Sequence, residues 1–319
     1  MEPLKHLAEI AYAVIGPIVV LVGAGFLIGR KVQAAAEVLA KILLYLLIPI
    51  YVFYNILTST LEAADYGTIV WFSALALVLL YGAARGVSAI RRHDPPLVGA
   101  FANTAILYNS ANFSIPVMAL AFGFDPAKET YAVAVQAVVA ACQGFAAYTV
   151  GAFIAAAGSG PVRHAMVKVF RLPFIYALVA ALVLKQFGVD GKALERVAIL
   201  SKPITIICGA YVPIALMTLG AQMACVKVIH ARLDVALSVV LRLALGPLLG
   251  LALVKLMGLD GLLAQVLIIG VAAPSAVASV VVAIEFKNRP DFASSAVFLS
   301  TLLAGITVPL VIFLVQAFL

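Results

Sequence analysis

The sequence predicts an all-α membrane protein of ten transmembrane helices in two inverted five-helix repeats. Three observations predict this class: the chain is too apolar for a soluble protein, its apolar segments are as long as membrane-spanning helices, and prolines recur at matching places in its two halves. Of the 319 residues, 65% are hydrophobic and 11% are charged, against about 45–50% and about 25% in a soluble domain. One soluble core of this size cannot bury so much apolar surface.

Ten spans account for nearly all of the chain, because one transmembrane helix takes about 20 residues. The apolar segments are far longer than the alternating segments of a membrane β-barrel. The expected spans are 10–29, 36–58, 67–90, 97–122, 130–157, 173–188, 197–224, 235–257, 262–286 and 292–318.

Lysine and arginine are distributed unevenly between the two sets of alternate connections, with twelve in one set and seven in the other. The twelve are Arg30, Lys31, Arg85, Arg91, Arg92, Arg163, Lys168, Arg171, Lys227, Arg232, Lys287 and Arg289. The richer set is expected in the cytoplasm, which places both termini outside a cell (plasma) membrane. This rule explains the net charge of +7 better than nucleic-acid binding does, since the basic residues form no stripe. The first nine residues carry two acids and no basic stretch, so no cleavable signal peptide is expected.

The longest interior connection, 158–172, divides the chain into a first repeat, 1–157, and a second, 173–319. Five spans in each half give the two repeats opposite orientations. We expect the connection itself in the cytoplasm.

Prolines stand in corresponding spans of the two halves. Pro49 in span two corresponds to Pro213 in span seven, and Pro116 in span four corresponds to Pro274 in span nine. A proline inside a helix removes one N–H and frees the carbonyl four residues earlier. In a membrane such broken backbone survives only inside protein or beside a water-filled cavity. Matched prolines therefore indicate an inverted-repeat transporter with discontinuous helices, in which half-helix N-termini attract anions and freed carbonyls hold cations. An ordinary kink is the alternative, above all for Pro49 and Pro213.

Neutral polar residues remain inside the expected spans, where they are costly unless they have partners. Asn112 lies four residues before Pro116, and Asn109 lies three residues earlier on the same helical face. Asn55 follows Pro49 by six residues. We expect these asparagines to reach a substrate cavity, with structural contacts between helices as the alternative.

Two further features of the spans have open interpretations. Tyr51 and its neighbouring tyrosines in span two, with Tyr108 near the break in span four, suit either a pocket for an aromatic acid or ordinary packing. Arg242, some seven residues into span eight, suits either a counter-ion for a carboxylate or a side chain that reaches the lipid headgroups.

The residues that several enzymatic and ion-coupling mechanisms require are not found inside the expected spans. The four histidines fall at the N-terminal end or in connections, and the acidic residues fall near span ends or in connections. No buried carboxylate for proton carriage, aspartate pair for an intramembrane protease or Ser-His-Asp arrangement is expected. Three scattered cysteines suit neither disulfides nor a metal site. We expect neither an enzyme nor a cofactor or metal.

Four stretches resemble the auxin efflux carrier family, which includes bacterial malate and malonate permease-like proteins and the plant PIN-formed auxin carriers. They are AKILLYLLIPIYVFYNIL in span two, ILYNSANFSIPVMALAFG in span four, PIALMTLGAQMA in span seven, and the tail VLIIGVAAPSAVASVVVAIEFKNRPDFASSAVFLSTLLAGITVPLVIFLV. The resemblance covers essentially the whole chain, and the combination of these stretches in this order is specific to the family.

The resemblance implies a scaffold of spans one, two, six and seven, through which the chain forms a homodimer, and a moving transport domain of spans three to five and eight to ten. Spans four and nine would cross at Pro116 and Pro274, with substrate beside the crossing. Asn112 matches the crossover asparagine of the family. The second crossover, Ala273-Pro274-Ser275, departs from the plant pattern, and the long cytoplasmic loop of the plant carriers is absent.

These observations together predict an elevator-type secondary transporter for small organic anions, working by efflux or uniport under the membrane potential. The expected substrate-binding residues are Asn112, Asn109, Pro116, Pro274, Ser275, Asn55, Tyr51 and Gln136. The expected partners are the organic anion, the lipid bilayer and a second copy of the chain.

Three other functions compete with this prediction. A sodium-coupled carboxylate symporter similar to the bile-acid family shares the crossover, and would hold sodium at Gln265, Ser275 and Ser279 with freed carbonyls. A non-transporting membrane receptor would bind ligand without flux. A channel would show turnover far above carrier rates.

Overall fold

A computed structural model describes residues 9–32, 34–156, 173–226 and 232–319. Over these ranges the protein is all helical, and one isolated β-bridge is the only extended pairing. Seven helical segments are long and apolar enough to cross a membrane: Tyr12–Lys31, Ala35–Thr58, Ala63–Arg91, Pro126–Ala156, Ala198–Ala224, Leu233–Leu256 and Pro290–Phe318. Three shorter apolar helices span Ser110–Ala121, Pro173–Gln186 and Gly261–Val271. The connection expected at 158–172 lies outside the described residues.

The first half contains the π-turn η1 (Ala11–Ile15), α2 (Gly16–Lys31), α3 (Ala35–Ile42), η2 (Leu43–Leu47), α4 (Ile48–Thr58), α5 (Ala63–Arg91), α6 (Pro95–Ile106), η3 (Ser110–Ser114), α7 (Ile115–Ala121), α8 (Pro126–Ala146), η4 (Ala147–Gly151) and α9 (Ala152–Ala156). The second half contains α11 (Pro173–Gln186), α12 (Gly191–Glu195), α13 (Ala198–Ala224), α14 (Leu233–Val240), η5 (Leu241–Leu245), α15 (Gly246–Leu256), α16 (Gly261–Val271), α17 (Val277–Glu285) and α18 (Pro290–Phe318). Every expected span coincides with a helix or a broken helix, whereas the inverted relation of the two halves stays a prediction.

Four prolines each stand two residues after a π-turn. They are Pro17 after η1, Pro49 after η2, Pro116 after η3 and Pro247 after η5. A proline ring clashes with the carbonyl four residues earlier and offers no N–H. In a π-turn each N–H donates to the carbonyl five residues earlier, so the turn is wider and leaves room for the proline ring. The helix therefore continues through the proline.

The expected break at Pro116 is therefore wrong in position. The chain leaves the helix at Leu107–Asn109, between α6 and η3, and Pro116 lies inside the helical segment that follows. The expected break at Pro274 is confirmed, because Pro274 lies between α16 and α17. Pro213 stays within the unbroken α13.

The two breaks meet at one point. Tyr108 and Ser275 form an antiparallel β-bridge, in which the Asn109 N–H donates to the Pro274 carbonyl at 2.8 Å and the Ala276 N–H donates to the Leu107 carbonyl at 2.8 Å. At each break some backbone N–H and C=O groups have no hydrogen-bond partner within their own helix, and the other break supplies partners for part of them. The two broken helices therefore cross at Tyr108 and Ser275.

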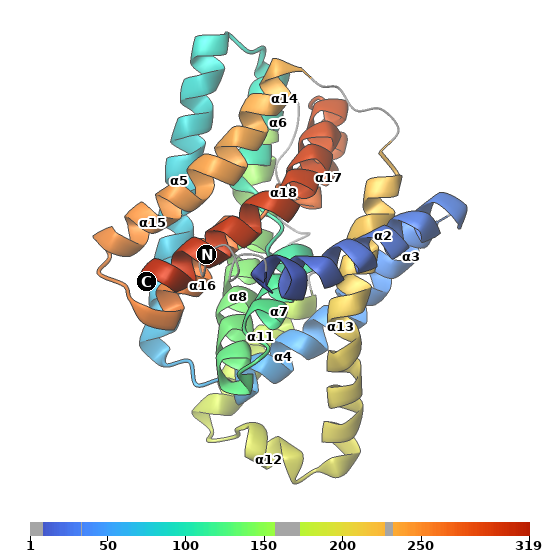
Figure 1. Cartoon of the computed structure of the whole chain (residues 1–319), viewed down its shortest axis with the longest axis vertical. Coiled ribbons are helices and arrows are strands. Elements are labelled where there is room, and N and C mark those ends of the chain that lie inside the picture. Colours follow the sequence, from blue (N-terminus) through green and yellow to red (C-terminus); the bar gives the residue numbers. More distant parts are fainter. Residues whose placement is uncertain (1–8, 33, 157–172, 227–231) are drawn as a thin grey trace.

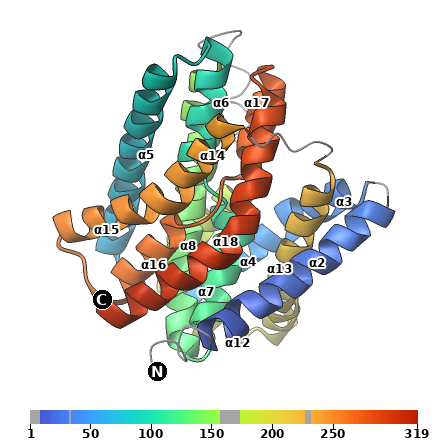
Figure 2. The same ribbon diagram turned by 45° about the horizontal axis from the view of Figure 1, so that its top comes forward.

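The helices form two groups (Figure 1). The right group consists of α2, α3 and α13 on the right of Figure 1 with α4 in the lower middle, and the left group consists of α5 and α15 on the left with α14 in the upper middle. α8 packs against both α5 of the left group and α4 of the right group. The same separation holds when the top of the molecule is turned forward (Figure 2).

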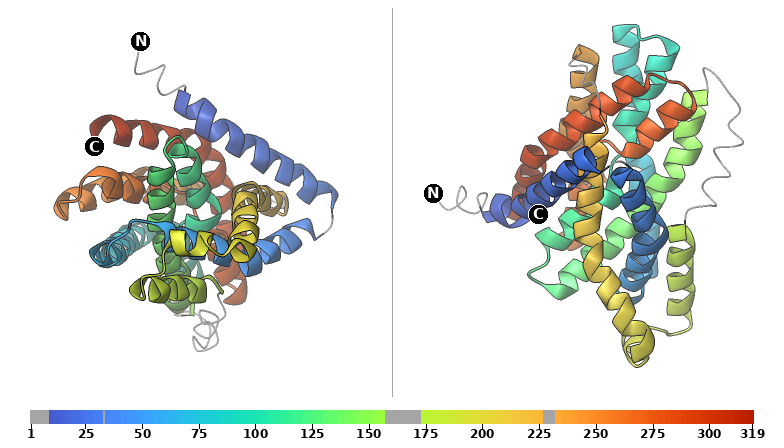
Figure 3. Two further views of the ribbon diagram at one scale, coloured as in Figure 1. Left: turned by 90° about the horizontal axis from the view of Figure 1, so that it is seen from below. Right: turned by 90° about the vertical axis from the view of Figure 1, so that its right-hand side faces the viewer.

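Small residues allow α2 and α13 to pack closely. α13 runs past α2 in the side view (Figure 3, right), and the two helices form the most extensive helix pair of the described structure. A Cβ added at Gly220 would lie 1.9 Å from the Val22 carbonyl oxygen, and one added at Gly25 would lie 2.0 Å from that of Met217. Backbones in such contact are typical of membrane helix pairs that must stay together.

Candidate functional site

A cavity of about 290 Å³ lies between the two helix groups, directly beside the crossing. Its wall is formed by residues of the crossing, of α17, of η2 and its flanking helices, and of α8 and η4. They are Ala40, Leu43, Leu44, Ile48, Leu107, Tyr108, Asn109, Ser110, Ala111, Asn112, Ala140, Gln143, Gly144, Ala147, Tyr148, Phe174, Gln222, Ala276, Val277, Ala278 and Val281. None of these lining residues is charged, so a ligand here meets apolar side chains, amides, hydroxyls and backbone.

Asn109 and Asn112, the two asparagines expected at the site, both line this cavity. Asn109 is the N-cap residue of η3, and its Oδ1 accepts from the Asn112 backbone N–H at 3.2 Å. The Asn109 Nδ2 is buried and has no hydrogen-bond partner among the described residues. A buried amide donor without a partner costs about 1–3 kcal/mol, which is a reason to expect a ligand acceptor there.

Two helix N-termini face the same cavity. Ser110, Ala111 and Asn112 begin the segment that continues into α7, and Val277 and Ala278 begin α17. The N-cap residue of α17, Ala276, makes no side-chain cap hydrogen bond. The Ser279 N–H already donates to the Ala276 carbonyl at 3.0 Å, which leaves the N–H groups of Val277 and Ala278 for a ligand. A helix N-terminus carries a partial positive charge and free N–H donors, which together bind anions.

Two glutamines hold the first break in place. Gln143 Oε1 accepts from the Tyr108 backbone N–H at 3.2 Å, and Gln136 Nε2 donates to the Ser110 carbonyl at 3.4 Å. Gln136 is fully buried beside Gly270, where an added Cβ would lie 2.4 Å from its Oε1. The structure therefore places Gln136 behind the crossing and not in the cavity wall. Gln143 lines the cavity, and nothing in the sequence distinguishes it from other glutamines in spans.

Ser275 is fully buried and holds the second break. Its Oγ donates to the Thr104 carbonyl at 2.7 Å, and its N–H donates to Ser300 Oγ at 3.1 Å. Ser275, Pro274 and Pro116 are absent from the cavity wall. These residues shape the crossing instead of lining the pocket.

Tyr51 and Asn55 also lie outside the cavity wall. The Tyr51 ring stacks on Tyr211 with centroids 4.1 Å apart, and the Tyr211 hydroxyl donates to the Ala111 carbonyl at 2.9 Å. Asn55 Nδ2 donates to the Tyr51 carbonyl of its own helix at 2.9 Å. The tyrosine pair thus connects α4 and α13 to the first residues of η3.

The residues expected to hold sodium are not brought together in one cavity. Gln265 lines a separate cavity of about 420 Å³ with Asp125, Lys128 and Gln316. Ser279 is buried in α17, and its Oγ donates to the Ala276 carbonyl at 2.7 Å. Among the described residues no group of three or more His, Cys, Asp or Glu side chains could hold a metal ion.

Arg242 does not reach the lipid headgroups, because its side chain is fully buried. Its guanidinium binds backbone carbonyls of α6 and α16 at the two breaks. The expectation of a headgroup contact is therefore wrong. Hydropathy does not predict this position of Arg242, because the ends of α6 and α16 are far from it in sequence and meet it only in the folded chain.

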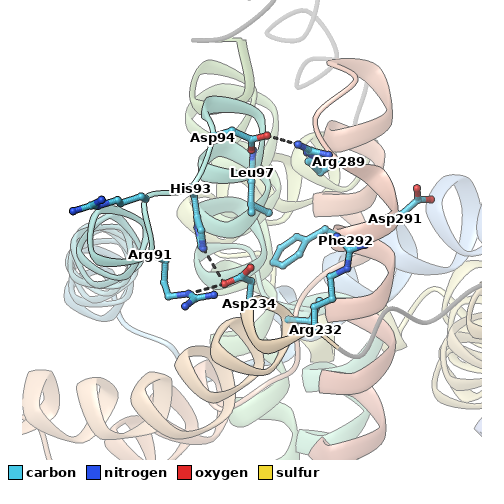
Figure 4. A pocket seen from close by; sticks show the side chains of 11 residues that line it. Arg91, His93, Asp94, Leu97, Arg232, Asp234, Arg289, Asp291 and Phe292 are labelled. Atoms are coloured by element: carbon cyan, nitrogen blue, oxygen red, sulfur yellow. Dashed lines mark hydrogen bonds and ion pairs between the residues drawn. The ribbon is translucent and has the colours of Figure 1, made fainter.

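A larger cavity of about 500 Å³ lies at the arginine-rich ends of α5, α6, α14 and α18 (Figure 4). Arg91 Nε and His93 Nε2 lie 3.0 and 3.1 Å from Asp234 Oδ1. Arg289 pairs with Asp94 and holds the pKa of that carboxyl below its usual range. These pairs tie together connections of the left helix group, and the cavity lies apart from the crossing.

Two sequence comparisons relate the chain to membrane transport proteins. The family model described as membrane transport protein matches residues 161–312. An uncharacterized transporter from Methanothermobacter thermautotrophicus is 32% identical over 102 residues, which are 32% of this chain and 34% of the relative. The match thus spans about a third of that relative's length. Together with the membrane-spanning helices, these matches support the resemblance found in the sequence: residues 161–312, just under half of the chain, are similar to a family of membrane transport proteins.

Proposed function

We propose that the protein is a secondary carrier for a small organic anion, with the cavity beside the crossing as its binding site. The observation that carries this proposal is the convergence on one cavity of two helix N-termini and of Asn109, whose buried Nδ2 has no hydrogen-bond partner among the described residues. The substrate carboxylate would accept from Asn109, Asn112 and the first N–H groups of α17. A site made of dipoles and amides releases an anion more readily than a buried ion pair does, which suits transport.

The lining favours an acid with one carboxylate and an apolar body. Leu44, Ile48 and Phe174 line the same cavity as the two asparagines, and ligand pockets of this kind combine apolar walls with a few polar anchors. A second carboxylate would find no cation among the lining residues, and an unpaired charge away from water is costly. Tyr108 and Tyr148 in the wall also suit an aromatic body.

Transport would proceed by relative movement of the two helix groups. In this proposal α2, α3–α4, α11 and α13 form the scaffold, which also mediates a homodimer, and the remaining helices form the transport domain. The close α2–α13 packing supports a rigid scaffold, and the cavity between the groups suits a site that moves with one of them. The two halves would be inverted repeats related through the crossing.

The position of the cavity along the helices indicates the side of the membrane to which it opens. The cavity wall includes Ala40 in α3, Gln222 in the last turn of α13 and Val281 in α17. Each of these helices has one end at a connection of the set rich in lysine and arginine. If those connections are cytoplasmic, the structure is an inward-facing form. An anion leaving an inside-negative cell gains about 2.3 kcal/mol per charge per 100 mV, so uniport export needs no coupling ion.

Charge movement in proteoliposomes on a solid-supported membrane tests the proposal. Phenylacetate, malonate and malate are added while sodium and pH are varied independently. We expect currents with phenylacetate that persist without sodium and are lost in Asn112→Ala, whose side chain lines the cavity. The same currents in folded Asn112→Ala, or no acid-dependent current and no isotope exchange, would overturn the proposal.

A further inference from the structure

The carbonyls that lose their intrahelical donors at the two breaks include those of Ala105 in α6 and Val271 in α16. In an unbroken helix the Asn109 N–H would donate to the Ala105 carbonyl, and the Ser275 N–H would donate to the Val271 carbonyl. In the structure the Asn109 N–H donates to the Pro274 carbonyl, and the Ser275 N–H donates to Ser300. The carbonyls of Ala105 and Val271 therefore need other donors.

Arg242 supplies both donors. Its Nη1 donates to the Ala105 carbonyl at 2.7 Å, and its Nη2 donates to the Val271 carbonyl. The side chain is fully buried within the described structure, and Gly246 one turn later leaves room for it, since an added Cβ there would lie 2.4 Å from Nη2. A single guanidinium thus replaces one lost backbone hydrogen bond in each of the two broken helices.

The charge of Arg242 is balanced by helix ends and not by a carboxylate. Its hydrogen-bond partners among the described residues are the two carbonyls alone. A helix C-terminus carries a partial charge of about −0.5, so the ends of α6 and α16 together offset about one positive charge.

Four helix ends meet at the crossing, two negative and two positive. Without a cation, the negative ends of α6 and α16 would largely cancel the positive ends of η3–α7 and α17 at the cavity. With Arg242 bound to the negative ends, the positive ends remain to determine the potential beside Asn109 and Asn112.

We propose that Arg242 is the positioning residue that makes the crossover cavity prefer anions, by holding and neutralising the two half-helix C-termini behind it. This inference rests on the proposed function, because it explains the charge preference of the same site. Arg242 acts without touching the substrate: it is absent from the cavity wall, and its guanidinium carbon lies 4.9 Å from the ring centroid of Tyr108, which does line the wall.

The test compares a carboxylate with its neutral amide. Phenylacetate and phenylacetamide have the same body, so the ratio of their affinities for purified full-length protein isolates the response to charge. We expect Arg242→Gln to lower that ratio by about tenfold or more, the combined effect of two helix ends, while the affinity for phenylacetamide stays nearly constant. Arg242→Lys restores most of the ratio because it keeps the charge.

A second variant covers the case in which Arg242→Gln does not fold. Gly246→Ala keeps every charge but pushes Nη2 away from the Val271 carbonyl, so we expect a smaller loss of the same ratio. Gly305→Ala in α18, where an added Cβ has no neighbour within 4 Å, is the matched control and leaves the ratio unchanged.

The outcomes separate this inference from the proposed function. A wild-type protein that prefers phenylacetate, with an unchanged ratio in folded Arg242→Gln or in Gly246→Ala, overturns the role of Arg242 alone. A wild-type protein that binds neither probe, nor malonate or malate, overturns the proposed function and this inference with it. Equal losses for phenylacetate and phenylacetamide would show a merely structural role, and would also overturn it.

Discussion

Replacing Asn109 by alanine separates binding from folding at the crossing. The change removes the Oδ1 cap on the Asn112 N–H, which costs about 1 kcal/mol of helix stability. It also removes the buried Nδ2 that has no partner among the described residues, and relief from such a group returns about 1–3 kcal/mol. The two effects oppose each other, so we expect the free energy of unfolding to stay the same or to rise by up to about 2 kcal/mol.

Ligand affinity should respond much more strongly. A hydrogen bond to a charged group contributes about 1.5–3 kcal/mol, which corresponds to about a 10- to 100-fold loss of affinity for a carboxylate in Asn109→Ala. The assay is equilibrium binding of labelled phenylacetate to purified protein, with thermal unfolding measured on the same samples.

Asn103→Ala is the matched control. Asn103 Nδ2 donates to the Gly151 carbonyl at 3.0 Å and lies outside the cavity wall. This variant should lose about 1–3 kcal/mol of stability with little change in affinity for the folded fraction. Unchanged phenylacetate affinity in Asn109→Ala, or the same pattern in both variants, would refute the reasoning.

Three further predictions concern the scaffold, the ion pairs and the side on which the cavity opens. Gly220→Ala, which forces α2 away from α13, should lower stability by at least about 1–3 kcal/mol in thermal unfolding, whereas Gly209→Ala in the same helix has no neighbour within 4 Å and should not. Asp234→Asn leaves two basic side chains without their carboxylate and should cost up to about 1 kcal/mol, less at high salt; an effect independent of salt would contradict the ion pairs. In a background without native cysteines, Ala278→Cys should react with a membrane-impermeant thiol reagent from the cytoplasmic side and Gln316→Cys from the other side, and the reverse pattern would contradict the orientation.

Composition and hydropathy were enough to predict the membrane class and the positions of the helices, because the bilayer demands long apolar segments of any sequence. Proline positions predicted one break correctly. Pro116 was misleading because a π-turn before it accommodates the ring, while the first break follows from the Asn109 N–H pairing with the Pro274 carbonyl. That pairing joins residues far apart in sequence, and no local pattern encodes it.

Only part of the candidate site could be predicted for the same reason. Asn109 and Asn112 both line a cavity, but Asn109 is the N-cap residue at the break and does not share a helical face with Asn112 as their spacing predicted. Tyr51 acts through Tyr211, and Arg242 binds carbonyls of two other helices. A polar residue in a membrane helix indicates that a hydrogen-bond partner is required. Tertiary packing decides which residue becomes that partner.

The most direct test of the central claim is the outward flux of labelled phenylacetate from sodium-free proteoliposomes held at zero or at inside-negative potential, with protein-free vesicles as reference. An anion uniporter with its site at the crossing predicts that the inside-negative potential accelerates efflux, that added sodium changes nothing, and that Asn109→Ala abolishes the protein-dependent flux. Flux that ignores the potential, requires sodium or persists in folded Asn109→Ala would contradict the account.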